Sequence, residues 1–574
     1  MPLEIVRRPA QDAGHLTSVE HPLLRQILAN RGVQDNQQLD LSAQQLVHFD
    51  RLRGIDVAVE LLADAIARQQ HIIVIGDFDA DGATSVALVM LALTQMGSKK
   101  HSYLVPNRFD FGYGLSPEIV DVAAQQGANL IMTVDNGIAC HAGVERARQQ
   151  GIDVIVTDHH LPGDSVPDAA AIVNPNQPGC EFPSKALAGV GVAFYVMLAL
   201  RHALKGRDWF SQNSIAVPNL ADLLDIVALG TVADVVPLDH NNRVLVYQGL
   251  QRIRSGRCRP GIRAMLEVAR KSLARIQSSD LGFVLGPRLN AAGRLDDMSL
   301  GIECLLSPNE GVAREMAVQL DSLNRERREI ESSMQAQAIE QLEQLVLDES
   351  DLPYGMVLYQ PDFHQGVIGI LAGRIKDRYH RPTIAFAHQD DMTLKGSARS
   401  VEGLHIRDVL DEIDRRQPGL MDKFGGHAMA AGLSLPVAHL EAFQTLFNRT
   451  VEQWMAGKPL HGQVLSDGEL PALDMTLDFA QQLQALGPWG QQFPEPRFDG
   501  TFTLLEQRIV GQKHLKMLLK QPDGKLLDAI AFNVDLSRWP DPTRQQARMA
   551  YKLDINEFRG RISVQLLVEA LEPA

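Results

Sequence analysis

Four short apolar runs rich in β-branched residues constrain the fold of this chain most strongly. They are IIVIG at 72–76, LIMTV at 130–134, DVIVT at 153–157 and AAIVN at 170–174. Helical stretches separate the runs, for example at 116–126 and 141–150. Strands that alternate with helices are typical of a parallel sheet with helices on both faces. We therefore predict an α/β fold built on a parallel sheet.

A long helical pattern begins after Pro308. Between Val312 and Asp351 there is no Gly or Pro, and apolar residues repeat at helical spacing. Such a helix would span about 50 Å at a rise of about 1.5 Å per residue, and we interpret it as a strut that joins two lobes. A second α/β pattern follows it. After about residue 460 several short strands with turn signals predict a small β-barrel.

Length and composition agree with several folded domains. The chain has 574 residues, and its 45% hydrophobic and 22% charged residues exclude a disordered or fibrous protein. The predicted domains are a Gln-rich helical lead-in at 1–45, the parallel-sheet domain at 46–307, the long helix at 308–350, a smaller α/β domain at 351–456 and the barrel at 457–574.

Cysteine usage and hydropathy indicate a reducing, aqueous compartment. Cys140, Cys180, Cys258 and Cys304 show no CxxC spacing, so we expect neither a disulfide framework nor a thiolate zinc site. The N-terminus has no apolar signal region. The longest uncharged apolar stretch, 186–200, is shorter than the ~20 residues that cross a bilayer and suits a buried helix. We expect a soluble, cytoplasmic protein with no membrane partner.

The net charge argues against a nucleic-acid partner at first sight. With 55 Lys and Arg against 70 Asp and Glu, the formal charge is −15. Binding depends on the local field, however, and basic residues gather at 251–275 around the single acid Glu267. This stretch predicts either a surface that follows a nucleic-acid backbone or a solvated helix face.

An acidic motif follows the first apolar run directly. It reads GDFDADG at 76–82, so that Asp77, Asp79 and Asp81 alternate. In an extended chain these side chains share one face, and a bound cation would relieve their repulsion. Gly82 allows a tight turn into a helix whose first residues suit a phosphate. The alternative is a solvated acidic turn or a helix cap.

Acids and histidines recur at later positions of the same kind. Asp135 follows the second run, Asp158, His159 and His160 follow the third, and Asp234 lies in the apolar run IVALGTVADVVPL. Ligands of open α/β sheets bind outside the carboxyl ends of the strands, so these groups would meet in one crevice. Oxygen ligands with few imidazoles favour Mn²⁺ or Mg²⁺, and zinc stays possible. Taken singly, each piece is also compatible with a turn, a solvated histidine pair or a helix cap.

Arginines next to glycine and asparagine form a second layer of candidates. They are Arg108 in PNR, Arg288, Asn290 and Arg294 in GPRLNAAGR, and Ser397 with Arg399 in GSARS. The planar guanidinium group suits phosphate oxygens, and glycine lets a backbone come close. These segments predict phosphate binding, although surface arginines are also often simply solvated.

Together the segments resemble the DHH phosphoesterase superfamily. The resemblance rests on GDFDADGATS, VDNG, VTDHH, GTVADVVPL, GPRLNAAGR, GSARS and FGGHAMAAG, and extends over residues 45–574. It is closest to the superfamily's exonucleases specific for single-stranded DNA, since the small phosphatases lack the long helix and the barrel. It implies a DHH catalytic domain at 46–307, a DHH-associated domain at 351–456 and an oligonucleotide-binding (OB) fold at 457–574.

The resemblance also implies roles for single residues. It assigns metal coordination to Asp77, Asp79, Asp81, Asp135, His159 and Asp234. It makes Asp79, Asp81, Asp135 and His160 catalytic, with His160 on the phosphate or in support of the ligands. It assigns the 5′-terminal phosphate to Arg108, Ser397 and Arg399, the strand's backbone to Arg288, Asn290 and Arg294, and the strand's path to Gly425, Gly426 and His427.

The implied function is a 5′→3′ exonuclease with two Mn²⁺ or Mg²⁺ ions that degrades single-stranded DNA to 5′-mononucleotides in recombination and repair. The implied partners are single-stranded DNA, a single-strand-binding protein and a helicase, for a monomer at the nucleoid. Barrel aromatics either stack on bases or form the barrel core: Phe502, Phe532, Tyr551 and Phe558. The alternatives are a DHH phosphatase of short oligonucleotides or cyclic dinucleotides, and an inactive scaffold that binds single strands.

Overall fold

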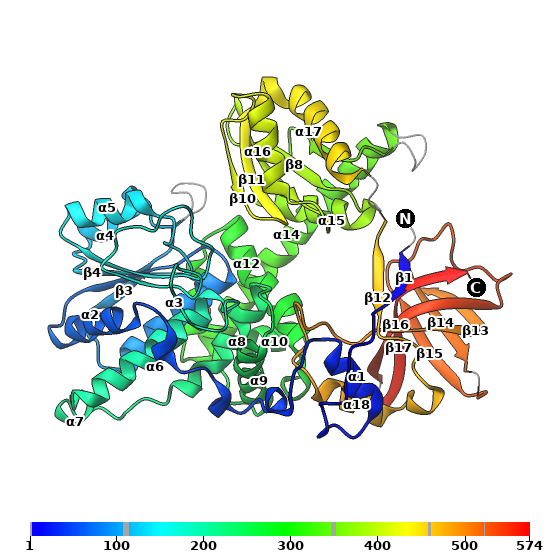
Figure 1. Ribbon diagram of the computed structural model, residues 1–574, viewed down its shortest axis with the longest axis horizontal. Coiled ribbons are helices and arrows are strands. Elements are labelled where there is room, and N and C mark those ends of the chain that lie inside the picture. The colour runs from blue at the N-terminus through cyan, green and yellow to red at the C-terminus, as the bar shows by residue number, and fades with distance from the viewer. Residues whose placement is uncertain are drawn as a thin grey trace. The chain divides into compact units, whose positions relative to one another are not determined.

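The computed structural model describes residues 3–106, 114–345, 352–456, 461–521, 523–558 and 560–573 (Figure 1). Arg108 and the side chain of Phe558 lie outside the described part. The chain forms two compact units. The catalytic unit, as we call it below, consists of Ala10–Asn324 and Gln484–Glu495, and the second unit of Met1–Pro9, Arg325–Leu483 and Pro496–Ala574.

A five-stranded parallel sheet forms the centre of the catalytic unit. Its order is β3-β2-β4-β5-β6, where the strands are β2 (Ile72–Ile75), β3 (His101–Leu104), β4 (Leu130–Val134), β5 (Asp153–Thr157) and β6 (Ala171–Val173). The predicted α/β class is thereby confirmed, with β3 as a strand that the sequence pattern did not reveal. The strands β2 and β4 are buried throughout, because helices cover both faces.

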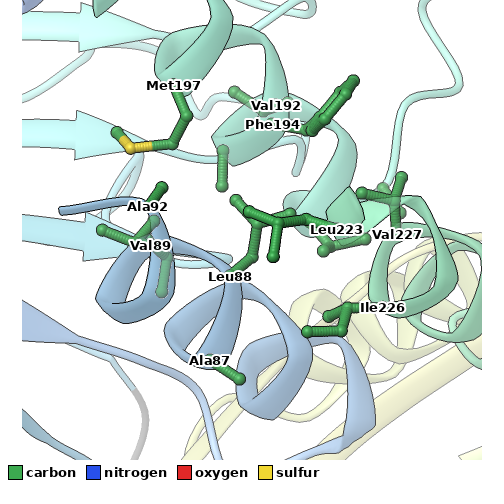
Figure 2. Close-up of a cluster of buried hydrophobic side chains, with 14 of the residues drawn as sticks. Ala87, Leu88, Val89, Ala92, Val192, Phe194, Met197, Leu223, Ile226 and Val227 are labelled. Atoms are coloured by element: carbon green, nitrogen blue, oxygen red, sulfur yellow. The ribbon is translucent and has the colours of Figure 1, made fainter. Parts of the chain in front are cut away.

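Two hydrophobic layers enclose this sheet. One face packs against α2 (Ile55–Ala67), α3 (Ala80–Gln95) and α6 (Gly189–Gly206), and the other against α4 (Pro117–Gln125) and α5 (His141–Gln149). Figure 2 shows the first layer, where apolar side chains of α3 and α6 meet Ile226 and Val227 of α8 (Leu224–Ala233). The apolar stretch at 186–200 is thus largely the buried helix α6, as predicted.

Helices complete the catalytic unit. They are α1 (Pro22–Ala29), α7 (Trp209–Gln212), α9 (His240–Arg254), α10 (Pro260–Val268), α11 (Ser278–Asp280), a π-helical turn at Leu281–Leu285, α12 (Gly286–Leu295) and α13 (Ser299–Leu306). The expected lead-in at 1–45 is not purely helical, since it begins with β1 (Glu4–Arg7), which itself belongs to the second unit and pairs there with β12 (Gln463–Ser466). The long helix α14 runs over Glu310–Leu345.

The second unit contains a mixed sheet and a closed barrel. The sheet has the order β10-β11-β9-β8-β7, built from β7 (Met356–Tyr359), β8 (Thr383–His388), β9 (Thr393–Arg399), β10 (Lys423–Gly426) and β11 (Ala430–Pro436). Its helices are α15 (Ile368–Tyr379), α16 (Ile406–Arg416) and α17 (Leu440–Met455), and α18 (Leu477–Ala485) precedes the barrel.

The barrel confirms the expected C-terminal β-structure. Its closed order β13-β14-β15-β17-β16 comprises β13 (Phe498–Val510), β14 (His514–Lys520), β15 (Leu526–Ala531), β16 (Gln546–Phe558) and β17 (Arg561–Pro573). Phe502 and Tyr551 are buried in its core, whereas Phe532 is half exposed. The four cysteines are free thiols. Within the described ranges, no helix combines the length and apolar character of a bilayer span.

Candidate metal centre

The acidic motif turns directly from strand into helix. After β2, Asp79 is the N-cap of α3, and its carboxylate accepts hydrogen bonds from the backbone N–H groups of Asp81 (2.8 Å) and Gly82 (3.0 Å). Asp81 therefore belongs to the first helical turn. The expectation of an extended segment with three acids on one face is wrong, because the capping interaction starts the helix between the second and third acid.

The predicted ligands nevertheless converge in two adjoining groups, and a third group joins Asp135 and His159 with His160. Asp77, Asp79 and Asp135 bring one oxygen each within 4.8 Å of one another, and Asp81, Asp234 and the imidazole of His159 do the same. His159 Nε2 joins the groups, since it lies 3.2 Å from Asp135 Oδ1 and 3.4 Å from Asp234 Oδ2. Asp234 comes from the C-cap of α8 and not from a strand end as expected.

The first turn of α6 fixes the orientation of Asp81. Gly189 N–H donates to Asp81 Oδ2 over 2.6 Å, and Val190 N–H donates to Asp81 Oδ1 over 2.9 Å. The N-terminus of a helix stabilises negative charge, so α6 partly compensates this buried acid. Gly189 also has to be glycine, because a Cβ atom there would lie 2.6 Å from the side chain of Asp135.

Asp158 organises the histidine pair. Its buried carboxylate accepts hydrogen bonds from Ile138 N–H (2.9 Å), from His159 N–H (2.7 Å) and from His160 Nδ1 (2.7 Å). Burial acts to raise the pKa of Asp158, but His160 outweighs it and the pKa lies below its usual range. From the sequence we expect this residue in the same crevice but assign it neither metal coordination nor catalysis, although its place at the head of the DHH motif is a signal.

The two imidazoles differ in protonation. Burial lowers the pKa of His159 to about 4, which leaves its lone pair available to a cation. Burial also acts to lower the pKa of His160, but the hydrogen bond with Asp158 and the charges of Asp77 and Asp79 raise it to about 9. The protonated His160 suits a phosphate oxygen.

The carboxylates repel one another strongly. Burial, followed by the charge of Asp79, raises the pKa of Asp81 to about 7. Burial, followed by the charge of Asp81, raises the pKa values of Asp135 and Asp234 well above their usual range. Five oxygen-bearing groups and one neutral imidazole fit divalent cations that prefer oxygen ligands, such as Mn²⁺ and Mg²⁺.

Helix α12 supports the motif loop from outside the sheet. Asn290 Oδ1 accepts a hydrogen bond from Ala80 N–H over 2.8 Å. Gly293 lies so close to the loop that a Cβ atom would fall 1.9 Å from the carbonyl oxygen of Phe78. Arg294 is half buried in the last turn of the same helix. The segment GPRLNAAGR is therefore part of the framework of the metal centre.

Arg288 does not join the acid cluster. It is buried, and its guanidinium group forms an ion pair with Asp321 of α14 over 2.7 Å and donates to the carbonyl of Val284 over 2.6 Å. The basic stretch at 251–275 is also largely engaged within the unit. Arg252 pairs with Asp222, Lys271 pairs with Asp280 over 2.7 Å, and Arg259 donates to carbonyls at the end of α13.

Ser397 and Arg399 lie side by side on β9 in the second unit. The guanidinium of Arg399 donates to Ser397 Oγ over 3.1 Å, and both side chains lie against Gly369 in the first turn of α15. Burial lowers the pKa of Arg399. In the described part of the chain no carboxylate pairs with Arg399, so its charge is available to an anion. His427 is exposed in the turn between β10 and β11 and follows Gly425 and Gly426 of β10.

Fold and site together define a phosphoesterase of the DHH type. Family models match at residues 71–231 (DHH family, N-terminal domain), 353–453 (DHHA1 domain) and 466–570 (RecJ OB domain). The chain belongs to the RecJ family, which confirms the resemblance found in the sequence.

Similar proteins cover the chain almost completely. The single-stranded-DNA-specific exonuclease RecJ of Escherichia coli is 56% identical over 100% of this chain and 99% of its own length. The protein of that name from Bacillus subtilis is 33% identical over 98% of this chain and 70% of its own. The crystal structure of RecJ in complex with Mn²⁺ from Thermus thermophilus matches with a TM-score of 0.79 at 27% identity, over 99% of this chain and 79% of that one.

Proposed function

We propose that the protein is a metal-dependent exonuclease that degrades single-stranded DNA. The observation that carries this proposal is the pair of adjoining ligand groups at the carboxyl edge of the parallel sheet, in a chain with a C-terminal OB barrel. The relatives that cover the whole chain carry the name of this activity. The cofactor is Mn²⁺ or Mg²⁺, the ions named for the similar RecJ structures.

The metal ligands in this proposal are Asp77, Asp79, Asp81, Asp135, His159 and Asp234. Two bound cations would lower the pKa of a water molecule and offset the charge that develops on the attacked phosphate. Asp135 is close to both groups and is suited to bridge them.

The remaining residues of the site fix the protonation of His160 and the positions of the ligands. Asp158 holds His160 protonated, and this imidazolium would donate to a non-bridging phosphate oxygen. The amides of α6 keep Asp81 in one orientation, and Asn290 keeps the preceding turn in place. Such preorganisation is worth most in a buried site, where the charges need not reorganise during the reaction.

We assign the polarity of the reaction to an anion site on β9. Ser397 and Arg399 would bind the 5′-terminal phosphate, and this anchoring would make the reaction run 5′→3′ with 5′-mononucleotides as products. The family resemblance assigns the same role to Arg108, which lies outside the described residues. Asn290, Arg294 and His427 remain candidates for the strand's backbone. Arg288 is a weaker candidate, since Asp321 already compensates its charge.

The biological setting extends the proposal. Recombination and repair produce single strands, so the enzyme would act at the nucleoid, as a monomer, with a helicase and a single-strand-binding protein as partners. The proposed domains span residues 1–45, 46–307, 308–350, 351–456 and 457–574.

The test is the digestion of a long 5′-phosphorylated single-stranded oligonucleotide in Mn²⁺. The wild type should release mononucleotides and leave a duplex intact. Asp135→Asn should be inactive, whereas Asp153→Asn, at the opposite end of β5, should behave as the wild type. Blocking the 5′ end should protect the strand, and blocking the 3′ end should not. Faster turnover of a dinucleotide would instead favour a small-substrate phosphatase, and binding without hydrolysis would favour an inactive scaffold.

A further inference from the structure

Three large apolar side chains are exposed next to the metal centre. Leu161 and Val235 are each 63% exposed and Phe283 is 79% exposed, although side chains of this kind are normally buried. Leu161 directly follows His160, and Val235 directly follows Asp234. Exposed apolar groups that collect around a functional site mark a binding surface more often than scattered ones do. We call these three residues the apolar rim.

The backbone holds Val235 outward in an unfavourable conformation. Its φ angle is 60°, in the left-handed region that a β-branched residue rarely adopts. The chain turns there immediately after α8, and Val235 N–H donates to the carbonyl of Val232 over 3.2 Å. Strain of this kind persists only where the surroundings enforce it, and it is concentrated at functional sites.

Phe283 is carried by a π-helical turn that packs on the end of α8. Gly282 lies so close to Val232 that a Cβ atom on this glycine would be 3.2 Å from the Val232 side chain. A Cβ atom on Gly286 would likewise be 3.1 Å from the Cβ atom of Ala233. The C-cap residue that follows Ala233 is Asp234, one of the proposed ligands. The turn therefore presents an aromatic ring to solvent from a closely packed position beside Asp234.

We propose that the apolar rim holds the sugar and base of the nucleotides at the reacting end of the strand, with Phe283 stacked on a base. This inference rests on the proposed function, because a phosphate bound at the acid cluster forces its nucleoside onto the neighbouring side chains. Unpaired bases offer free π-faces to an aromatic ring, whereas bases in a duplex are already stacked. The rim would thus favour single strands without reading their sequence.

The experiment measures binding of fluorescent 5′-phosphorylated oligothymidylate by anisotropy, with Ca²⁺ in place of Mn²⁺ so that hydrolysis does not interfere. Phe283→Ala should raise the Kd roughly tenfold, and Phe283→Trp should restore the affinity, because one base-aromatic stack contributes about that factor. Val57→Ala is the matched control, since Val57 is 51% exposed on α2 and lies outside the rim. Its Kd should equal that of the wild type.

Oligonucleotides with one abasic position near the 5′ end identify which base stacks on the Phe283 ring. On the substrate that lacks the stacked base, wild type and Phe283→Ala should bind equally, whereas Leu161→Ala should still bind more weakly because its contact is with sugar. A Kd of Phe283→Ala within twofold of the wild type, or an equal loss on every abasic substrate, overturns the inference. Hydrolysis by the wild type in Mn²⁺, measured separately, decides the proposed function independently of these Kd values.

Discussion

Replacing Asp234 by asparagine should stabilise the protein when divalent cations are absent. The substitution keeps the shape of the side chain, removes a buried carboxyl group whose own pKa is raised by burial and by the charge of Asp81, and removes one of the charges that raise the pKa of Asp135. A carboxyl group whose pKa is higher in the folded than in the unfolded chain stabilises the fold at low pH. This contribution is present below about pH 4 and is lost as the pH rises through the folded pKa.

The magnitude follows from Asp81, which sits in the same cluster. Burial and the charge of Asp79 raise its pKa from the ordinary 3.8 to about 7. At about 1.4 kcal/mol for each tenfold change in proton affinity, ionising this group in the metal-free fold costs about 4 kcal/mol at neutral pH. Asp234 lies in the same cluster and its pKa is also raised well above its usual range, so Asp234→Asn should raise the free energy of unfolding and the melting temperature in the absence of metal.

The assay is thermal unfolding in EDTA at about pH 5 and about pH 8, repeated with Mn²⁺. The gain from Asp234→Asn should be large at the higher pH and small at the lower one, where the wild-type group is protonated. Mn²⁺ should stabilise the wild type strongly and the variant weakly, because bound ligand stabilises only the state that binds it. Asp153→Asn, exposed at the start of β5, controls for a general charge effect. Equal melting temperatures of wild type and Asp234→Asn at the higher pH would refute the reasoning.

Two further predictions concern the framework around the site. Gly293→Ala should destabilise the protein by about 3 kcal/mol in urea unfolding and reduce nuclease activity, because the added Cβ atom would lie 1.9 Å from the Phe78 carbonyl oxygen. Gly206→Ala is the control: a Cβ atom at Gly206 meets open space, so both stability and activity should stay as in the wild type. Arg288→Met should cost about 3–5 kcal/mol in urea unfolding because it removes the guanidinium group that forms a buried ion pair with Asp321 over 2.7 Å. The double variant Arg288→Met, Asp321→Leu should recover most of this loss, and a single variant as stable as the double would contradict the ion-pair argument.

Much of the architecture could be predicted because local pattern and global fold agree. The runs at 72–76 and 130–134 are apolar apart from Gly76 and Thr133, as suits the interior of a two-sided parallel sheet, and they form β2 and β4, which are buried at every position. The long helix was readable from its lack of Gly and Pro. The strand β3, with the sequence HSYL, is only partly buried and carried no such pattern.

The geometry of the proposed metal ligands could be predicted less well from the sequence. The run around Asp234 is apolar almost throughout, and such a run does not distinguish a strand from a buried helix, so the helix α8 was missed. The roles of Asp158 and Asn290 depend on hydrogen bonds to Ile138 and Ala80, which are distant in the sequence. Periodicity contains no information about partners of this kind.

The net charge of −15 can be reconciled with a DNA substrate on structural grounds. In the basic stretch at 251–275, Arg252, Arg263 and Lys271 pair with carboxylates of the same unit, so the stretch supplies less long-range attraction than its sequence suggests. The acid cluster repels phosphate until cations neutralise it. In the proposed function, affinity would come mainly from short-range groups: the metal centre, the protonated His160, the proposed anion site at Arg399 and the proposed apolar contacts with bases. Such a protein would gain little from counterion release, and an intact duplex, which offers mainly its phosphates, would be held only weakly.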